Sequence, residues 1–364
     1  MKGLVLAGGA GTRLRPLTAT SAKQLVPVAN KPILYYGLED LAEAGIVEVG
    51  IIVGDTEDEI RKAVGDGSTW GLSVTFLRQE RPLGLAHCVV VAQDFLGQDD
   101  FVMYLGDNLL RRGVRDFVAA FEEERAAARA VGAEGPAAQI LLAHVPDPQR
   151  FGVAELSPSG EVVRLVEKPT NPPSDLALVG VYLFDARIHE AVDAIGPSPR
   201  GELEITDAIQ WLIEQGYPVR SQVVAGYWKD LGERSAMLEG NRLVLEGIEP
   251  AVLGEVDDES RIEGRVVIED GAKVVRSVVR GPAIIGRRTV VEDSFVGPFT
   301  SISDDCLVVR SEVEHSVVMA SCQIVDIARL TDSLIGREVI VTRTDVRPRS
   351  VRLMLGDHSR VDLA

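Results

Sequence analysis

The chain has 364 residues, and 46% of them are hydrophobic, which is enough to bury sizeable cores. Its 38 basic and 55 acidic residues give a formal net charge of −17, which argues against general binding to nucleic acids or to anionic membranes. No stretch approaches the roughly 18 apolar residues of a membrane span. From the charge and from this absence together, we expect neither a nucleic acid nor a membrane as a partner. Because a single core rarely grows to this length, we predict two domains, at residues 1–247 and 248–364.

The start of the chain lacks a charged and then apolar signal segment, so we expect a cytoplasmic location. The cysteines Cys88, Cys306 and Cys322 are odd in number and have no spacing typical of a metal site. We interpret them as buried or free thiols in a reducing compartment.

The first predicted element is a short apolar strand at residues 3–6, and a glycine-rich loop follows it at residues 8–13 (GGAGTR). Glycines allow backbone N–H groups to turn toward a phosphate chain and to approach it closely. Arg13 adds a fork of donors that suits phosphate oxygens, and Lys23 adds a compact positive charge. The loop is not a dinucleotide fingerprint, since Leu14 replaces the third glycine, and it is not a P-loop, since no Lys-Ser or Lys-Thr pair follows the last glycine. We therefore predict a nucleotide-binding loop of another kind.

Up to about residue 250, apolar strand-like runs alternate with helical patterns, which favours a layered α/β sheet with parallel strands. Strands are expected at residues 49–53, 73–77, 100–105 and 139–143, and helices at residues 56–64, 85–93 and 113–130. The pattern is less regular afterwards, with short strands expected at residues 152–155, 162–167 and 177–184 and helices at residues 203–214 and 233–246.

From about residue 251 the helical periodicity disappears and a repeat begins. Serine followed by two apolar residues recurs at positions 277, 294, 316 and 333, which are 17, 22 and 17 residues apart. Branched apolar residues recur every six positions, at 279, 285 and 291 and again at 296, 302 and 308. This spacing predicts a triangular solenoid with one short strand per side, and it resembles the hexapeptide repeat of the left-handed β-helix. The charged pairs at 287–288 and 304–305 are expected at solvated corners.

The loop, continued through Leu14-Arg15-Pro16 and Lys23, resembles the signature GGxGTRLxP…K of the nucleotidyltransferases that make nucleotide sugars. The match extends through residues 24–28 and 31–33, and residues 65–72 and 200–206 are typical of the glucose-1-phosphate thymidylyltransferases. The resemblance implies an α/β fold, with a three-layer Rossmann-like nucleotidyltransferase domain that has a mixed sheet. The repeat after it is similar to the left-handed β-helix domain of the long forms.

Joining a sugar 1-phosphate to a nucleoside triphosphate requires one phosphate anion to attack the α-phosphorus of another, and their repulsion is the main obstacle. Cations and positioning matter more than a general base, because the nucleophile is already ionised at pH 7. The resemblance implies a Mg²⁺ ion held by Asp107, at the end of the strand predicted at residues 100–105, and by Asp230. Two carboxylates, phosphate oxygens and water make a suitable octahedral site.

The resemblance implies that dTTP and glucose 1-phosphate react to give dTDP-glucose and pyrophosphate, for deoxysugar biosynthesis. It places the catalytic roles on Arg13, Lys23, Lys168 and Arg200. The amide of Gln79 is expected to read a pyrimidine base, and further nucleotide contacts are expected at Leu6, Gly8, Gly9, Gly11, Thr12, Gln24, Gly84 and Asp107. The sugar phosphate is expected at Asn108, Gly152, Glu167, Lys168, Val179 and Arg200.

Three alternatives remain open at this point. The chain could be a UTP-dependent uridylyltransferase of the same fold, because nothing in the local chemistry rejects a ribose 2′-hydroxyl. It could be a bifunctional enzyme whose β-helix acetylates a sugar, for which His315 is the histidine within the repeats that could act as a base. It could also be a regulatory subunit that binds a nucleotide sugar without turnover. We expect the residues after about 250 to serve assembly and stability, and we expect a homo-oligomer.

Overall fold

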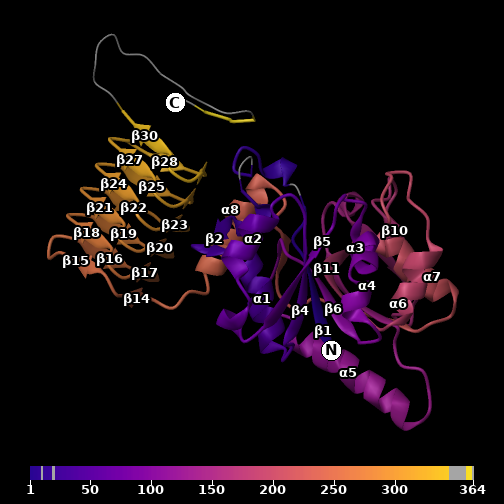
Figure 1. The fold of residues 1–364 in the computed structure, drawn as a ribbon. Helices are drawn as coiled ribbons and strands as arrows, with labels where there is room; N and C mark the ends of the chain where they lie inside the picture. The colour runs from indigo at the N-terminus through magenta and orange to yellow at the C-terminus, as the bar shows by residue number, and fades with distance from the viewer. Residues whose placement is uncertain (10, 19–20, 344–357, 363–364) are drawn as a thin grey trace. The chain divides into compact units, whose positions relative to one another are not determined.

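The computed structural model describes residues 1–9, 11–18, 21–343 and 358–362 (Figure 1). Contacts group the chain into two compact units. The first, which we call the sheet unit, comprises residues 1–10 and 34–230. The second, which we call the solenoid unit, comprises residues 11–33 and 231–364. The N-terminal signature is therefore divided, because the chain passes from one unit to the other between residues 10 and 11.

The sheet unit is built on a mixed sheet in which β11, β6, β1, β4 and β5 are successive neighbours. The parallel strands are β1 (Lys2–Leu6), β4 (Glu48–Val53), β5 (Ser73–Arg78) and β6 (Phe101–Leu105). The direction reverses at β11 (Leu176–Phe184), which is antiparallel to β6 and to β8 (Ala138–His144). The sheet is completed by β9 (Gly152–Leu156), β10 (Val162–Glu167) and β12 (Val219–Val223). The mixed sheet implied by the signature is thus confirmed.

Helices pack against both faces of this sheet and give it three layers (Figure 1). On one face, a core cluster joins Leu4, Leu6 and Met103 to residues of α3, α6 and α7. On the other face, the ring of Tyr104 packs against Gly37 of α1. The helices are α1 (Ile33–Glu43), α2 (Glu57–Val64), α3 (Leu85–Val91), α4 (Gln93–Leu96), α5 (Arg115–Ala130), α6 (Arg187–Ala194) and α7 (Ile205–Glu214).

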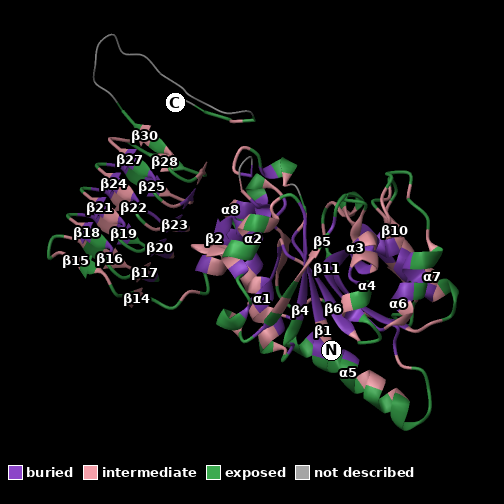
Figure 2. Cartoon of the chain, in the orientation of Figure 1, coloured by how far each residue is buried: buried purple, intermediate pink, exposed green. Residues whose placement is uncertain are grey.

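Several elements of the sheet unit differ from those expected from sequence. The helix expected at residues 85–93 is divided at Ala92 into α3 and α4, and α1, α6 and β12 were not expected. The buried residues of α5 are Phe117, Val118 and Phe121 in its first two turns, and apart from Arg125 the rest of that helix is largely exposed (Figure 2). No helix in the described ranges has both the length and the apolar character needed to cross a membrane.

The solenoid unit stacks short parallel strands into three sheets, which is the arrangement expected of a left-handed β-helix and confirms that part of the fold prediction. The first sheet contains β14 (Ala251–Val252), β17 (Val266–Ile268), β20 (Ala283–Ile285), β23 (Thr300–Ile302), β26 (Val317–Val318) and β29 (Leu334–Ile335). The second contains β15 (Glu255–Val256), β18 (Lys273–Val275), β21 (Val290–Glu292), β24 (Leu307–Val309), β27 (Gln323–Val325) and β30 (Ile340–Thr342). The third contains β16 (Arg261–Glu263), β19 (Val278–Arg280), β22 (Phe295–Val296), β25 (Glu312–Glu314) and β28 (Leu330–Thr331).

The six-residue periodicity read from the sequence marks the interior of this solenoid. The apolar residues at its expected positions have no exposed surface: Val279, Ile285, Val291, Val296, Ile302 and Val308. The irregular step of 22 residues also has a physical explanation. Ser277 and Ser294 precede strands of the third sheet, whereas Ser316 and Ser333 precede strands of the first. The four triplets therefore lie in two columns on different sides of the solenoid.

Side chains at equivalent positions of successive coils form hydrogen-bonded ladders inside the solenoid. The backbone N–H of Ser277 donates to Ser260 Oγ at 3.0 Å, and that of Ser294 donates to Ser277 Oγ at 3.0 Å. A second column runs from Thr289, whose Oγ1 accepts from the N–H of Cys306 at 3.0 Å, to Cys322. Cys306 and Cys322 are buried free thiols, as is Cys88 in the sheet unit, in agreement with the sequence interpretation.

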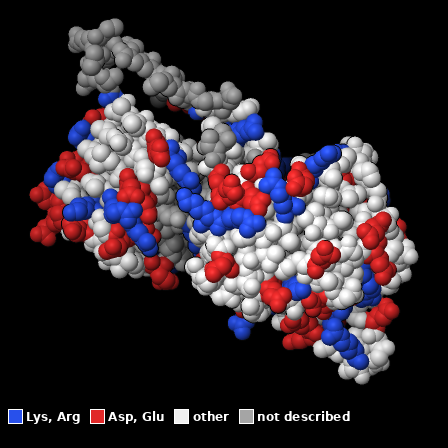
Figure 3. Space-filling view, viewed as in Figure 1, with Lys and Arg blue, Asp and Glu red and all other residues white. Residues whose placement is uncertain are grey.

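The charged pairs of the solenoid lie at its corners, as expected. Arg288 and Asp305 both have left-handed backbones, with φ of 56° and 57°. The Arg288 guanidinium donates to both carboxylate oxygens of Asp305, at 2.6 and 2.7 Å. Arg310 and Asp326 form a second exposed pair of this kind, and basic and acidic side chains accordingly lie next to one another on the surface (Figure 3).

The solenoid unit also includes part of the signature and one helix. The segment from residue 11 to residue 33 contains the short strands β2 (Pro27–Val28) and β3 (Lys31–Pro32), and α8 (Arg234–Leu245) packs beside β2 and β23. The fully buried amide of Asn241 joins α8 to the segment 11–33 and to the coils of the solenoid. Its Oδ1 accepts from the N–H of Ala29 at 2.9 Å and from Ser301 Oγ at 2.8 Å, and its Nδ2 donates to the carbonyl of Phe299 at 3.1 Å.

Candidate functional site

The carboxyl ends of β1, β4 and β6 meet at one edge of the sheet, where the first predicted residues lie. The N–H of Gly106, just after β6, donates to the carbonyl of Leu6 at 3.0 Å. The backbone just after β1 passes close to the backbone just after β4. A Cβ atom added at Gly54, after β4, would lie 2.9 Å from the carbonyl oxygen of Gly8, after β1. Ligands of open α/β sheets bind outside such strand ends, which is where the sequence analysis expects the nucleotide.

Asp107 and Asp230, which are far apart in sequence, are brought to one end of a pair of short strands. The short strand β13 (Trp228–Asp230) pairs antiparallel with β7 (Asn108–Leu110), and this pairing places Asp230 opposite Asn108. Asp107 directly precedes Asn108, so both carboxylates stand at the same end of this strand pair. Both residues are half-buried.

Asn108 holds this strand pair in place. Its buried Oδ1 accepts from the indole Nε1 of Trp228 at 2.5 Å and from the N–H of Gly180 at 3.3 Å, and its Nδ2 donates to Asp107 Oδ1 at 3.0 Å. The sequence analysis did not single out Trp228, although the tryptophan two residues before the expected metal ligand was a signal that could have found it. The proposed contact of Asn108 with a sugar phosphate stays a prediction, as does that of Val179, which is fully buried on β11.

A second cluster gathers four of the residues expected to bind the sugar phosphate. The pairing of β9 with β10 places Gly152 opposite Glu167. Arg200 Nη1 lies 3.2 Å from Glu167 Oε1, and Lys168 Nζ lies 3.4 Å from the same oxygen. The other oxygen, Oε2, accepts from Thr206 Oγ1 at 3.2 Å, and a Cβ at Gly152 would lie only 2.6 Å from the Thr206 methyl group.

The backbone of Lys168 is held in an uncommon conformation within this cluster. Its φ of 40° lies in the left-handed region, which a lysine rarely occupies. Its N–H donates to the carbonyl of Phe151 at 3.0 Å, which holds the turn after β10. Backbone strain of this kind concentrates at functional sites, and here it occurs at a half-exposed cation whose Nζ lies 3.4 Å from Glu167 Oε1.

Carboxylates outnumber cations around Arg200. Its guanidinium lies 3.2 Å from Glu204 Oε1 and 3.4 Å from Glu202 Oε1, in addition to its contact with Glu167. Burial raises the pKa of Glu204, and burial followed by the charge of Glu167 raises the pKa of Asp207. A phosphate dianion that entered this cluster would therefore compete with carboxylates for the same two cations, Lys168 and Arg200.

The loop expected to approach a nucleobase is tied to the segment that carries Arg200. The N–H of Leu203 donates to the carbonyl of Leu83 at 2.7 Å, and the N–H of Ala86 donates to the carbonyl of Leu203 at 3.0 Å. Gly84 lies between these bonds with a φ of 106°, and a Cβ there would lie 2.4 Å from the Leu203 carbonyl oxygen. The glycine is needed for this backbone contact, and its contact with a base stays a prediction.

Gly9 and Gln79 also lie in the sheet unit, whereas the other residues predicted to bind the nucleotide, from Gly11 to Gln24, lie in the solenoid unit. Gly11 has a left-handed φ of 60°, and a Cβ there would lie 2.9 Å from the Cβ of Lys23, so the loop packs directly on that lysine. Thr12 and Arg13 begin a short 3-10 turn, and Arg13 Nη1 lies 3.4 Å from Glu233 Oε1. Gln24 is buried, and its Oε1 has no hydrogen-bond donor among the described residues.

The donor set near β7 and β13 suits a hard divalent cation. Asp107 and Asp230 offer carboxylate oxygens, which are the ligands that Mg²⁺ prefers, and Mg²⁺ usually binds one or two carboxylates together with water and substrate phosphates. No group of three or more His, Cys, Asp or Glu residues that could hold a metal occurs within the described ranges. A cation here would thus depend on the substrate for part of its coordination.

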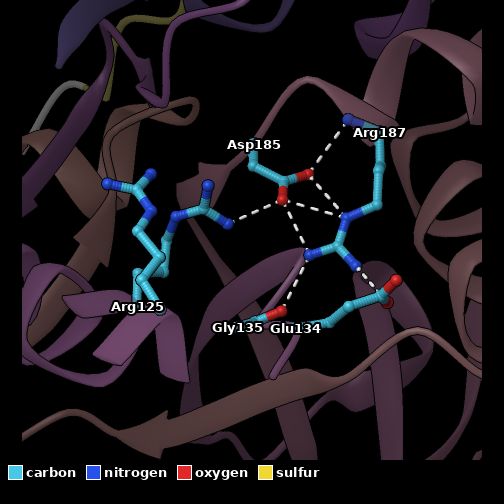
Figure 4. A pocket seen from close by; sticks show the side chains of 6 residues that line it. Arg125, Glu134, Gly135, Asp185 and Arg187 are labelled. Carbon is cyan, nitrogen blue, oxygen red and sulfur yellow. Dashed lines mark hydrogen bonds and ion pairs between the residues drawn. The ribbon is translucent and has the colours of Figure 1, made fainter. Parts of the chain in front are cut away.

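A pocket elsewhere in the sheet unit contains none of the predicted residues (Figure 4). It is lined by charged side chains that neutralise one another around the buried Asp185, whose Oδ2 lies 2.6 Å from Arg125 Nη1 and 2.7 Å from Arg187 Nη2. Arg125 also lies 2.8 Å from Asp100, and Arg187 lies 3.2 Å from Glu134. The network ties α5 to the start of α6, and its charges are already paired.

Comparisons with known proteins agree with this geometry. A family model described as nucleotidyl transferase matches residues 2–247. The chain is 58% identical to a glucose-1-phosphate thymidylyltransferase of Streptomyces griseus over 364 residues, which is 100% of both chains. It is 56% identical to the enzyme of that name from Streptomyces antibioticus, over 100% of this chain and 99% of the relative.

Among solved structures, a Bacillus anthracis protein assigned as a glucose-1-phosphate thymidylyltransferase and crystallised with sucrose is similar, with a TM-score of 0.62 and 33% identity. The similarity covers 69% of this chain and 97% of the other. The family model spans more than half of the chain, and the resemblance seen in the signature loop is confirmed. The chain therefore belongs to the nucleotidyl transferase family.

Proposed function

We propose that this protein transfers a thymidylyl group from dTTP to glucose 1-phosphate, giving dTDP-glucose and pyrophosphate in the cytoplasm for deoxysugar biosynthesis. The observation that carries the proposal is the 58% identity, over the whole of both chains, with a relative named for this reaction. The sheet unit supplies two carboxylates on neighbouring strands and a separate cluster of two cations, which are the groups that such a reaction needs.

The chemistry asks the protein to bring two anions together in line. The glucose 1-phosphate oxygen attacks the α-phosphorus of dTTP, a new P–O bond forms, and the bond to pyrophosphate breaks. Because the attacking phosphate is already ionised, the protein must offset charge and hold the reactants in register rather than remove a proton.

Asp107 and Asp230 would hold a Mg²⁺ ion. When bound, this cation offsets negative charge on the phosphate groups of the triphosphate. The two aspartates stand at one end of the β7–β13 pair, which Asn108 and Trp228 lock by side-chain hydrogen bonds. The backbone pairing would keep the carboxylates in place before the substrates arrive.

The sugar phosphate would bind at Lys168 and Arg200. Both cations contact Glu167 in the structure, so the incoming phosphate exchanges with a carboxylate that is already positioned there. Once released from them, Glu167 can accept hydrogen bonds from sugar hydroxyls. Gly152 leaves room beside Glu167, and Val179 and Asn108 would form the wall next to the sugar.

The triphosphate would bind at the signature loop. Backbone N–H groups of Gly8, Gly9, Gly11 and Thr12 would face phosphate oxygens, with Leu6 beneath them, while Arg13 and Lys23 supply positive charge. Gln79, Gly84 and Gln24 would recognise the base. The weak contact of the exposed Arg13 with Glu233 leaves the guanidinium available for a stronger, bidentate partner.

We propose that the boundary between the catalytic part and the β-helix lies near residue 247 and that the protein forms a homo-oligomer. The test of the function is pyrophosphate release measured with dTTP, UTP, dCTP and dATP, each paired with glucose 1-phosphate, galactose 1-phosphate and N-acetylglucosamine 1-phosphate, with and without Mg²⁺. The highest kcat/KM for dTTP with glucose 1-phosphate supports the proposal. A higher value for UTP would make the protein a uridylyltransferase, and no pyrophosphate release from any pair would refute catalysis altogether.

A further inference from the structure

The amide of Gln79 lies at the end of β5 and is held by neighbours on α3. Gln79 Nε2 lies 2.9 Å from His87 Nδ1, 3.3 Å from Cys88 Sγ and 3.5 Å from the carbonyl oxygen of Gly84. A backbone carbonyl only accepts hydrogen bonds, so the end of the amide that faces Gly84 must be the NH₂ group. The orientation of the amide is therefore set by its surroundings.

The three contacts are mutually consistent. Burial raises the pKa of the Cys88 thiol to about 12, so the thiol stays protonated and can donate to the Gly84 carbonyl, 3.6 Å away. Burial lowers the pKa of His87, so the ring is neutral near pH 7 and Nδ1 can accept from Gln79 when Nε2 carries the proton. Both hydrogens of the Gln79 amide thus have acceptors.

The other end of the amide faces the opposite way. A Cβ built on Gly8 would lie 3.7 Å from Gln79 Oε1, so this oxygen lies beside the signature loop. No described residue donates a hydrogen bond to Oε1, whereas Nε2 has three neighbours. Toward the signature loop, Gln79 therefore presents only a hydrogen-bond acceptor, Oε1.

We propose that His87 is a positioning residue that fixes the Gln79 amide with Oε1 toward the base, so that the site selects pyrimidines with a ring N–H over cytosine. This inference rests on the proposed function, because it assumes that Gln79 meets the base of the triphosphate. Thymine and uracil carry a hydrogen on N3 and can donate to Oε1, whereas N3 of cytosine is an acceptor and would face another acceptor. A site built to receive a hydrogen bond discriminates against an analogue that lacks the donor.

The experiment compares His87→Phe, which keeps a ring of similar size without an acceptor, with His87→Asn, whose Oδ1 can take the place of Nδ1. The readout is the ratio of kcat/KM for dTTP to that for dCTP, from pyrophosphate release with saturating glucose 1-phosphate. In His87→Phe the amide loses its shortest contact, at 2.9 Å, and keeps only the longer ones with Cys88 and Gly84. The reversed amide, which presents NH₂ to the base, then becomes accessible, so we expect the ratio to fall about five- to tenfold, the worth of one hydrogen bond. His87→Asn should restore most of the ratio.

Two controls separate positioning from a general effect on folding. In a Gln79→Leu background, His87→Phe should not change the ratio further, because it acts only through the amide. His144→Asn, at an exposed histidine paired with Asp175, should leave the ratio unchanged. Melting temperatures of all variants show whether a loss of activity reflects unfolding, in which case dTTP and dCTP turnover would fall together.

The inference is overturned if His87→Phe is folded and keeps the wild-type ratio, or if Phe and Asn at position 87 give the same ratio. Its failure can be told from failure of the proposed function by the wild-type protein alone. If the wild type prefers a purine triphosphate or releases no pyrophosphate, the proposed function fails before any variant is compared.

Discussion

Replacing Asn241 with alanine is expected to destabilise the solenoid unit strongly. The side chain has no exposed surface and makes three hydrogen bonds, with the N–H of Ala29, the hydroxyl of Ser301 and the carbonyl of Phe299. Alanine would leave the buried N–H of Ala29, the buried hydroxyl of Ser301 and the partly buried carbonyl of Phe299 without these partners. Unsatisfied buried groups cost about 1–3 kcal/mol each, so we expect the free energy of unfolding to fall by roughly 3–5 kcal/mol.

The same substitution should reach the signature segment, because Ala29 lies six residues after Lys23 in the same unit. We therefore expect dTTP to bind more weakly to Asn241→Ala than to the wild type at temperatures where both are folded. Urea unfolding followed by circular dichroism measures the stability, with each transition fitted separately because two units need not unfold as one. Isothermal titration with dTTP measures the binding.

The matched control is Arg242→Ala, one residue further along α8. Arg242 is partly exposed and pairs with Glu246 one turn away, an interaction worth about 0.3–0.5 kcal/mol. If Asn241→Ala costs no more than Arg242→Ala, or if it weakens stability while dTTP affinity is untouched, the reasoning that this amide supports the signature segment is wrong.

Three further predictions concern charge. Asp107→Asn should lower kcat by roughly 10²–10³ at saturating Mg²⁺ with an unchanged melting temperature, because it removes a metal-ligand charge, and near-normal turnover would exclude Asp107 from the metal site. Arg13→Ala should lower turnover and Arg13→Lys should recover little of it, since a lysine lacks the guanidinium fork; full recovery would mean that a point charge suffices. The hydrogen bond from Arg288 holds the pKa of Asp305 below its ordinary value. In acid the unfolded chain therefore binds more protons than the folded one. The stabilisation of the folded state by this pair is present above pH about 4 and is lost as the pH falls further. The melting temperature of Asp305→Asn should accordingly lie below that of the wild type at pH 7, and the difference should shrink as the pH falls below about 4; a difference that does not change with pH would contradict this.

Local periodicity and the signature motif predicted much of this architecture. The six-residue spacing of Val279, Ile285 and Val291 identified the solenoid interior because each coil repeats one side-chain environment. Asp107 and Asp230 were proposed together only through the family resemblance. Their pairing by β7 and β13 could not be read from periodicity, because strands of three residues are too short to show any.

What the sequence could not reveal depends on packing between distant segments. β11 runs antiparallel to β6, and this reversal of direction cannot be read from the composition of Leu176–Phe184. The orientation of the Gln79 amide requires the positions of His87, Cys88 and Gly84 to be known. Residues 11–33 are joined to the solenoid by hydrogen bonds of Asn241 and Asn30, two side chains that nothing in the sequence singles out.

The hydroxyl ladders of the solenoid determine how this domain can change in length. Each coil offers an acceptor to the next at a step of 17 residues, as between Ser277 and Ser294, or of 16, as between Cys306 and Cys322. Duplication or loss of one whole coil keeps each backbone N–H of the ladder bonded to the side chain at the equivalent position of the preceding coil. A one-residue insertion within a strand instead turns its interior side chains outward and breaks the ladder. Coil length can therefore differ by a residue at a corner, as the steps of 17 and 16 show, whereas strands can be gained or lost, in evolution or in an engineered variant, only together with a whole coil.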